Sequence, residues 1–512
     1  MRLRGLALLG ILALSGQAQE ADFLRARSAE VLPAPLNEAA ASIDSTRLRT
    51  HLAYLSDPKR QGRGLGTQGL DATVAYLELQ LQALGLKPLG RTYRQAVPLR
   101  EVRPDGGSIL ISTAAGDRTF LAGRDAILPP LTPGLLSGPL VYVGYGIQEP
   151  SLQHDDFRGV EVRGKVVVFR DGTPSEAIWR RPDLVEKYAS PRPADRYDSR
   201  LALLEKRGAK AAIALEPGLE QRLREGKEPT LPYFLAAEGL PGSGEPPLAR
   251  LSFQPELLEQ LTAGGTANLE IRGRVRSLQG VNLLAQLEGS EPTLRRSAIL
   301  LGAHMDHLGM PGGVLHPGAD DNASGVAALL EILRVAKAAS RRPRRTLLFA
   351  FWTGEEEGKF GSGHYTRQPR WSLSRTEAYL NLDMVGHPWT AADLRTLLEG
   401  AGLKDPAGFL AGLDPADFVE PGLPPGHPEL ATALAQAGQG TGLSLHLDWT
   451  DGRSGGSDYR DFARLNVPFI RFFGSYFPEY HQPGDTLDKL DPDQVRRMAR
   501  LALGTAWLLA DR

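Results

Sequence analysis

At 512 residues the chain exceeds the length that one hydrophobic core usually serves, so we expect two or more domains. Its composition, 42% hydrophobic and 23% charged, is ordinary for a globular protein. A formal net charge of -1 excludes bulk electrostatic attraction to nucleic acid or to an anionic membrane. Cysteine is absent, so neither disulfides nor a lipid-modified cysteine can contribute.

Residues 1–18 predict an export signal. Two arginines precede an apolar run, and Gly16 and Ala18 occupy positions -3 and -1 of a cleavage site. The apolar run is too short to span a bilayer. We therefore expect a secreted or periplasmic protein that is not inserted in a membrane after signal cleavage, with residues 19–43 as a polar linker.

Residues 44–134 are predicted to begin the main domain. The glycine-rich sequence GRGLGTQG (62–69) leads into a helix that ends near Gly85. It lacks the Gly-Lys-Ser/Thr ending of a phosphate-binding loop, and no strong strand precedes it. We interpret it as a plain turn.

Residues 135–272 differ from the preceding segment in their pattern of apolar runs and loops, and this pattern predicts an inserted, mostly β domain. The runs GPLVYVGYGI, GKVVVFRDG and AAIAL are typical of strands, and one helical stretch lies among them. Segments rich in proline and glycine mark loops. The insert has no cluster of histidine and carboxylate residues at metal-ligand spacing.

Residues 273–512 alternate apolar runs with helical stretches. The runs VNLLAQLEG, SAILLGAH, TLLFAFWT, AYLNLDMVG and VPFIRFFG predict strands, and SGVAALLEILRVAKAA predicts a helix. This alternation predicts an α/β fold with a mostly parallel mixed sheet and helices on both faces. The apolar stretch 495–510 is interrupted by arginines and predicts an amphipathic surface helix.

Polar residues lie at the ends of these predicted elements. His304-Met305-Asp306 and Glu355-Glu356-Glu357 follow two of the strand runs, Asp383 lies at the end of a third, and Asp320-Asp321-Asn322 precedes the predicted helix. Ligands of open α/β sheets bind at the carboxyl ends of the strands. Imidazoles and carboxylates are the usual protein ligands of divalent metals such as zinc. The sequence therefore predicts a metal site at this edge of the sheet.

Spacing within the clusters suggests distinct roles. In an extended segment, residues i and i+2 share a face, so the Asp306 carboxylate is predicted to hold the His304 imidazole from behind. Adjacent Glu355 and Glu356 are predicted to diverge. One can then bind metal while the other faces substrate as a general base.

These motifs resemble the M28 family of co-catalytic metallopeptidases. The family includes bacterial zinc aminopeptidases and glutamate carboxypeptidase-like enzymes. Residues 44–88 are similar to the family's N-terminal segment, and 135–272 resemble the protease-associated (PA) domain of many members. The matching motifs, in order, are GAHMDHLG, PGADDNASG, WTGEEEGKFGS, NLDMVG, GGSDY and YHQPGDTLDKL.

The resemblance implies two divalent metal ions, zinc being expected, and a full set of ligands for them. One ion would bind Asp321, Glu356 and His481, and the other His304, Asp321 and Asp383. Asp321 would bridge the two ions. A non-catalytic member of the superfamily should have lost ligands, and none is missing here.

The resemblance also implies that Glu355 is the general base and that Tyr480 stabilises the oxyanion. Tyr459 departs from the pattern, because many members have histidine after the aspartate of GGSDY. The implied function is an exported aminopeptidase that hydrolyses peptides. Which residue is removed stays open.

Other functions remain possible from the sequence. A glutamate carboxypeptidase-like enzyme or a glutaminyl cyclase-like enzyme with a single zinc would share the fold. A more distant alternative is a serine hydrolase, because residues 452–456 fit G-x-S-x-G with Ser454 as nucleophile, and Asp458 and His481 could complete a triad. A chelator would silence the metallopeptidase and spare the serine enzyme.

Overall fold

The computed structural model describes residues 32–512 except 190–192, 229–231, 238–246, 401–404 and 454–455. The predicted signal, residues 1–18, therefore lies outside the described residues. Every helix of the described part is too short or too polar to cross a membrane. Within the predicted linker, Ala34–Ala41 form helix α1, whose Leu36 and Ala40 are buried.

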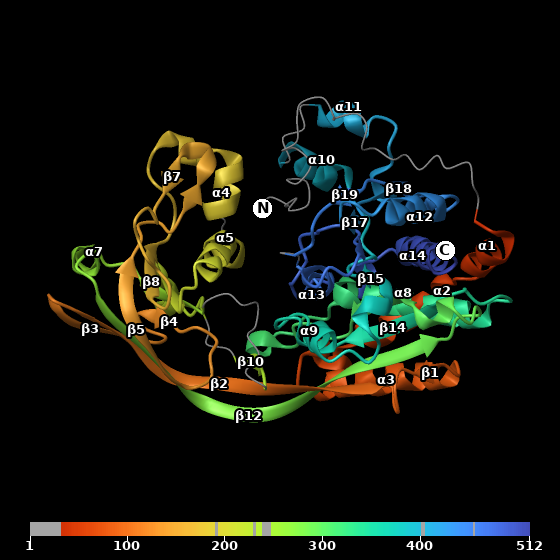
Figure 1. The fold of residues 1–512 in the computed structure, drawn as a ribbon, viewed down its shortest axis with the longest axis horizontal. Helices are drawn as coiled ribbons and strands as arrows, with labels where there is room; N and C mark the ends of the chain where they lie inside the picture. Colours follow the sequence, from red (N-terminus) through yellow and green to blue (C-terminus); the bar gives the residue numbers. More distant parts are fainter. Residues whose placement is uncertain (1–31, 190–192, 229–231, 238–246, 401–404, 454–455) are drawn as a thin grey trace. The chain divides into compact units, whose positions relative to one another are not determined.

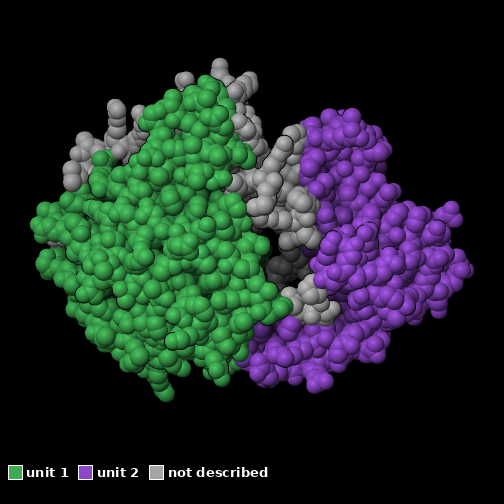
Figure 2. All heavy atoms as spheres, turned by 180° about the vertical axis from the view of Figure 1, so that it is seen from behind, with its two compact units in different colours: residues 1–97, 279–512 green, residues 98–278 purple. Residues whose placement is uncertain are grey.

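The chain divides into two compact units (Figure 2). Unit 1 contains the described residues up to Val97 together with Gln279–Arg512, and unit 2 contains Pro98–Leu278. Both boundaries fall inside long strands, β2 (Arg94–Thr113) and β12 (Gly265–Leu287). Unit 2 is thus wider than the predicted insert 135–272, because the strands that flank the insert continue into its sheet.

Unit 1 contains the mostly parallel sheet that the sequence predicts (Figure 1). Neighbouring strands β20, β15, β13 and β14 run parallel, and the end of β12 pairs antiparallel with β14. β13 and β14 are buried along their whole length, which explains their continuous apolar sequences. The strands are β1 (Lys87–Pro88), β13 (Ala298–His304), β14 (Thr346–Trp352), β15 (Thr376–Leu382), β16 (Phe418–Val419), β17 (Gly422–Leu423), β18 (Ser444–Leu445), β19 (Asp448–Trp449) and β20 (Phe469–Phe472).

Helices cover both faces of this sheet. One set packs around α8 and α14, and α9 and α13 join the aromatic core on the opposite side of β13 and β15. Thirteen residues of α14 are buried, so the predicted surface helix at 495–510 is instead enclosed by its neighbours. The remaining helices of unit 1 and their bounds are α2 (Ser45–Leu55), α3 (Gln68–Ala83), α8 (Gly325–Ala338), α9 (Phe360–Arg367), α10 (Ala391–Gly400), α11 (Pro406–Leu410), α12 (Pro428–Gly438), α13 (Tyr459–Arg464) and α14 (Pro492–Ala510).

Unit 2 contains more helix than the predicted β-rich insert. Parallel strands β5, β8, β9 and β11 form its centre, with apolar clusters on both faces. β2, β3 and β10 form an antiparallel part. The elements are β3 (Gly116–Leu121), β4 (Ala126–Ile127), β5 (Gly134–Tyr142), β6 (Gln148–Glu149), β7 (His154–Asp155), β8 (Val166–Arg170), α4 (Pro182–Ala189), α5 (Pro193–Lys206), β9 (Ala211–Glu216), α6 (Leu219–Arg224), β10 (Tyr233–Ala236), β11 (Leu248–Ser252) and α7 (Pro255–Leu261).

Candidate metal centre

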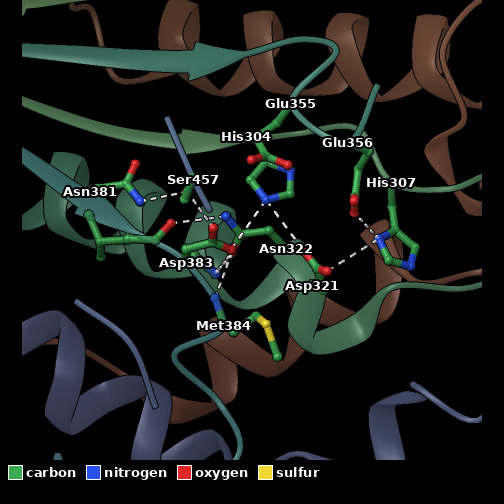
Figure 3. Close-up of polar contacts among 12 residues, drawn as sticks. His304, His307, Asp321, Asn322, Glu355, Glu356, Asn381, Asp383, Met384 and Ser457 are labelled. Atoms are coloured by element: carbon green, nitrogen blue, oxygen red, sulfur yellow. Dashed lines mark hydrogen bonds and ion pairs between the residues drawn. The ribbon is translucent and has the colours of Figure 1, made fainter. Parts of the chain in front are cut away.

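The predicted ligands meet at the carboxyl edge of the unit 1 sheet. His304 is the last residue of β13, and Asp383 directly follows β15. Asp321 lies in the turn before α8, and Glu356 in the turn after β14. Figure 3 shows these side chains pointing toward one another. His481 joins them from the segment between β20 and α14.

The Asp321 carboxylate is the centre of the arrangement. Its Oδ1 lies 3.3 Å from His304 Nε2, and its Oδ2 lies 3.1 Å from His481 Nε2. Each imidazole also meets a second carboxylate: His304 Nε2 lies 3.2 Å from Asp383 Oδ1, and His481 Nε2 lies 3.1 Å from Glu356 Oε2. Two groups of three donors therefore share one carboxylate, with a different oxygen facing each group.

The donors fit divalent metal ions. Tetrahedral zinc with bonds of 2.0–2.2 Å places neighbouring ligand atoms roughly 3.3–3.6 Å apart, close to the 3.1–3.3 Å separations found here. Donor atoms of His304, Asp321 and Glu356 all lie within 4.8 Å of one another. Imidazole and carboxylate form the donor set that zinc prefers.

The electrostatics of the group favour positive charge. Burial would lower the pKa of His481, but hydrogen bonds and charge from Asp321 and Glu356 raise it to about 10. Burial would raise the pKa of Glu356, but His307 and His481 hold it at about 2. Imidazoles that bind a proton this strongly lie in a strongly negative potential. Metal ions would displace those protons on binding.

Glu355 lies in a different environment from Glu356. Its buried carboxylate pairs with Lys359 Nζ at 3.0 Å. Burial raises its pKa to about 7, although Lys359 and His304 oppose that shift. The two adjacent glutamate side chains therefore diverge, as the sequence predicts. Glu356 contacts the His481 imidazole, whereas Glu355 contacts the Lys359 ammonium.

Asp306 does not hold His304 in the predicted way. The His304 Nδ1 atom lies 3.2 Å from the backbone oxygen of Asp306 and 4.0 Å from its carboxylate. The carboxylate instead accepts hydrogen bonds from the backbone amides of Glu355 and Glu356, at 3.3 and 3.4 Å. The prediction assumed an extended segment, but β13 ends at His304, so the alternation of faces ends there too.

Three further side chains, to which the sequence assigns no role, support the ligands. Asp485 accepts hydrogen bonds from the amides of Asp320 and Asp321 at 2.9 and 3.1 Å. Ser457 donates to Asp383 Oδ2 at 2.5 Å. His307 Nδ1 lies 2.6 Å from Glu356 Oε1, which agrees with a supporting role for this histidine rather than a ligand. These residues lie within the motifs GAHMDHLG, GGSDY and YHQPGDTLDKL, but the sequence alone does not show which way their side chains point.

Tyr480 and Tyr459 differ in their surroundings. The Tyr480 ring stacks on His481 with centroids 3.9 Å apart, so it lies beside the ligand group. Burial raises its pKa well above the ordinary value. Tyr459 stacks on Phe469 within the aromatic core. Ser454, the nucleophile of the serine hydrolase alternative, lies outside the described residues.

Arg63 ties the N-terminal segment to the metal loops. It belongs to GRGLGTQG, which forms a turn before α3, and its side chain is fully buried. The guanidinium donates to five backbone carbonyls at 2.7–3.3 Å, those of Leu55, Met305, Pro317, Gly318 and Asp321. The Arg63 side chain thus links five backbone positions, four of which lie in the segments that carry His304 and Asp321.

Arg63→Met should destabilise unit 1 by roughly 3–5 kcal/mol, the usual cost of breaking a buried charged network. Five buried carbonyls would lose their donor. Arg47→Met on the exposed face of α2 is the control and should change stability by less than about 0.5 kcal/mol. Calorimetric melting in chelator separates folding from metal binding. Equal melting of the two variants would contradict this role.

The fold and the centre define an α/β protein with paired histidine and carboxylate groups at the strand ends. Residues 282–506 match the model of Peptidase family M28. Leupeptin-inactivating enzyme 1 of Streptomyces exfoliatus is 26% identical over 238 residues, 45% of this chain and 48% of that protein. Leucine aminopeptidase 1 of Sclerotinia sclerotiorum is 28% identical over 231 residues, 43% of this chain and 54% of that protein.

The chain thus spans about half the length of these relatives. A solved aminopeptidase from Aneurinibacillus sp. strain AM-1 shares the fold, with a TM-score of 0.52, 21% identity, and coverage of 92% of this chain and 95% of that one. Residues 282–506, the part of the chain that matches peptidase family M28, lie within unit 1.

Proposed function

We propose that the protein is an exported zinc metallopeptidase that removes N-terminal residues from peptides. The observation that carries the proposal is the Asp321 carboxylate, whose two oxygens face two separate imidazoles. A relative named Leucine aminopeptidase 1 supports the aminopeptidase specificity. The basic and apolar start of the chain supports export.

Two metal ions would be held by the two groups of donors. His304, Asp321 and Asp383 would bind one ion, and Asp321, Glu356 and His481 the other. The three carboxylates carry three negative charges against four positive charges of two divalent ions. When bound, such ions would polarise a carbonyl group and lower the pKa of water from far above neutrality to roughly 7.

Glu355 would act as the general base. Its carboxylate is buried beside the ligands and holds or releases a proton near neutral pH. It would take a proton from the attacking water and pass it to the leaving amine. Tyr480 would donate its hydroxyl proton in a hydrogen bond to the carbonyl oxygen as negative charge develops there.

Unit 2 would act as a PA-like domain that shapes substrate access. Among the described residues of unit 2, His, Asp and Glu side chains form no group with metal-ligand spacing. Several of its acidic side chains pair with arginines or accept from turn amides instead, as Glu216 does with Arg250 and Asp156 with the amide of Ile147. The unit would therefore supply no residue to the reaction.

Purified protein should release N-terminal residues from a panel of aminoacyl and peptide substrates, and lose that activity in chelator. Zinc should restore it. N-acetylated peptides of the same sequence are the matched controls and should resist cleavage. Cleavage at the C-terminus, or cyclisation of N-terminal glutamine, would assign the carboxypeptidase-like or cyclase-like alternative. Activity that survives the chelator would contradict the metallopeptidase.

A further inference from the structure

Lys359 occupies a position that is unfavourable for a lysine in three ways. Its side chain is only 13% exposed, although an ammonium group is costly to bury. Its backbone is left-handed, with φ of 59°, a conformation that non-glycine residues rarely adopt. It is also the N-cap of α9, where the helix dipole disfavours a cation and where its side chain caps no amide.

One contact offsets these costs. Lys359 Nζ lies 3.0 Å from Glu355 Oε1. The turn that joins them is closed by hydrogen bonds from the amides of Gly358 and Lys359 to the Glu355 carbonyl, at 3.0 and 2.9 Å. Backbone hydrogen bonds and a side-chain ion pair therefore both hold Lys359 next to Glu355.

The surroundings keep Lys359 charged. Burial would lower the pKa of its ammonium, but Glu355 raises it, and Asp458 does so too, against repulsion from Arg460. Asp458 precedes α13, and Arg460 lies within that helix. The ammonium thus contacts the Glu355 carboxylate directly, and the fully buried Asp458 side chain adds to the electrostatic environment that keeps it charged.

We propose that Lys359 is a positioning residue that fixes the carboxylate of Glu355 toward the reacting water. The inference rests on the proposed function, in which Glu355 is the base. A glutamate side chain has three rotatable bonds, and a general base must stand within hydrogen-bond reach of the proton it takes. A displacement of about 1 Å can cost 10²-fold in rate.

Lys359→Met should lower kcat by about 10–100-fold and change KM by less than about threefold, because the positioned base acts in the transition state. Metal content should stay at the wild-type value. Lys359→Arg keeps the charge and should recover part of the rate. Lys87→Met is the matched control: it removes an exposed pair with Glu288 of 3.1 Å and should leave kcat unchanged.

The same substitution in a Glu355→Gln background separates positioning from a general loss of structure. With the base already removed, Lys359→Met should cost little further activity. A full second loss would overturn the proposal. A wild-type rate in Lys359→Met, in an enzyme that Glu355→Gln inactivates, would also overturn it while leaving the proposed function intact.

Melting of the metal-free protein tests the pair without any activity. The shifts in Tm of Glu355→Gln and Lys359→Met should not add, and the double variant should melt close to Lys359→Met alone. Additive shifts would overturn the pairing. Absence of peptidase activity in the wild type would instead contradict the proposed function and would leave this measurement decisive for the contact.

Discussion

Glu355→Gln should lower kcat by roughly 10²–10⁴-fold, the usual contribution of a general base, and should retain the metal content of the wild type. Glutamine keeps the size and hydrogen-bonding capacity of the side chain but cannot accept the proton. KM should change little, because the lost interaction acts in the transition state. Steady-state kinetics and elemental analysis of the same preparation measure both effects.

Its two neighbours are the controls. Glu356 lies 3.1 Å from His481 and 2.6 Å from His307, so Glu356→Gln should weaken one metal site, and excess zinc should restore part of the activity. Glu357 is exposed, and Glu357→Gln should be nearly silent. If Glu355→Gln loses metal and Glu356→Gln keeps it, the assignment of the acidic run is displaced by one residue.

The sequence predicted that part of the metal centre would come together, because apolar runs show clearly where buried strands end. Continuous apolar runs such as those of β13 and β14 mark fully buried parallel strands, and the chain leaves each one at the same edge. His304 and Asp383 therefore had to lie close together once the runs were recognised. Asp321 and His481 come from irregular segments, and only the resemblance to the M28 motifs identified them.

Side-chain direction beyond the strand ends could not be predicted in the same way. Asp306 turns toward the amides of Glu355 and Glu356 because the strand has ended. From the sequence, Lys359 would be expected to be an exposed residue of a charged turn. In the structure the hydrogen-bonded turn places its ammonium against the Glu355 carboxylate. The hydrophobic periodicity of a short segment predicts whether it forms a helix or a strand. The contacts of Asp306 and Lys359 depend instead on how turns from different parts of the chain pack together.

The burial of helix α14 was also hard to predict from the sequence of residues 495–510 alone. The arginines of 495–510 suggested a surface helix, yet α14 lies against α8, α12 and α2, with arginines such as Arg497 reaching out to Asp417. Long polar side chains can extend from a buried helix to its edge. Unit 2 also begins earlier and ends later than the predicted insert 135–272, because its limits fall inside β2 and β12, which continue from one unit into the other without a break.

Asp321→Ala should abolish the binding of both metal ions, the largest loss expected from any single substitution at the centre. Each group of donors would keep one histidine and one carboxylate, fewer than the three protein ligands that catalytic zinc sites usually have. Activity should fall below detection and should not return with excess zinc. Elemental analysis of the wild type should give close to two equivalents.

Asp383→Ala provides the comparison that makes this result specific. Asp383 meets His304 but belongs to one group only, so its removal should release one equivalent and leave the other bound by Asp321, Glu356 and His481. Melting in chelator should show both variants folded, because neither carboxylate is needed to fill the core. If Asp321→Ala keeps one equivalent, the carboxylate is not shared. If the wild type binds a single ion, the assignment of two metal ions that share Asp321 is wrong.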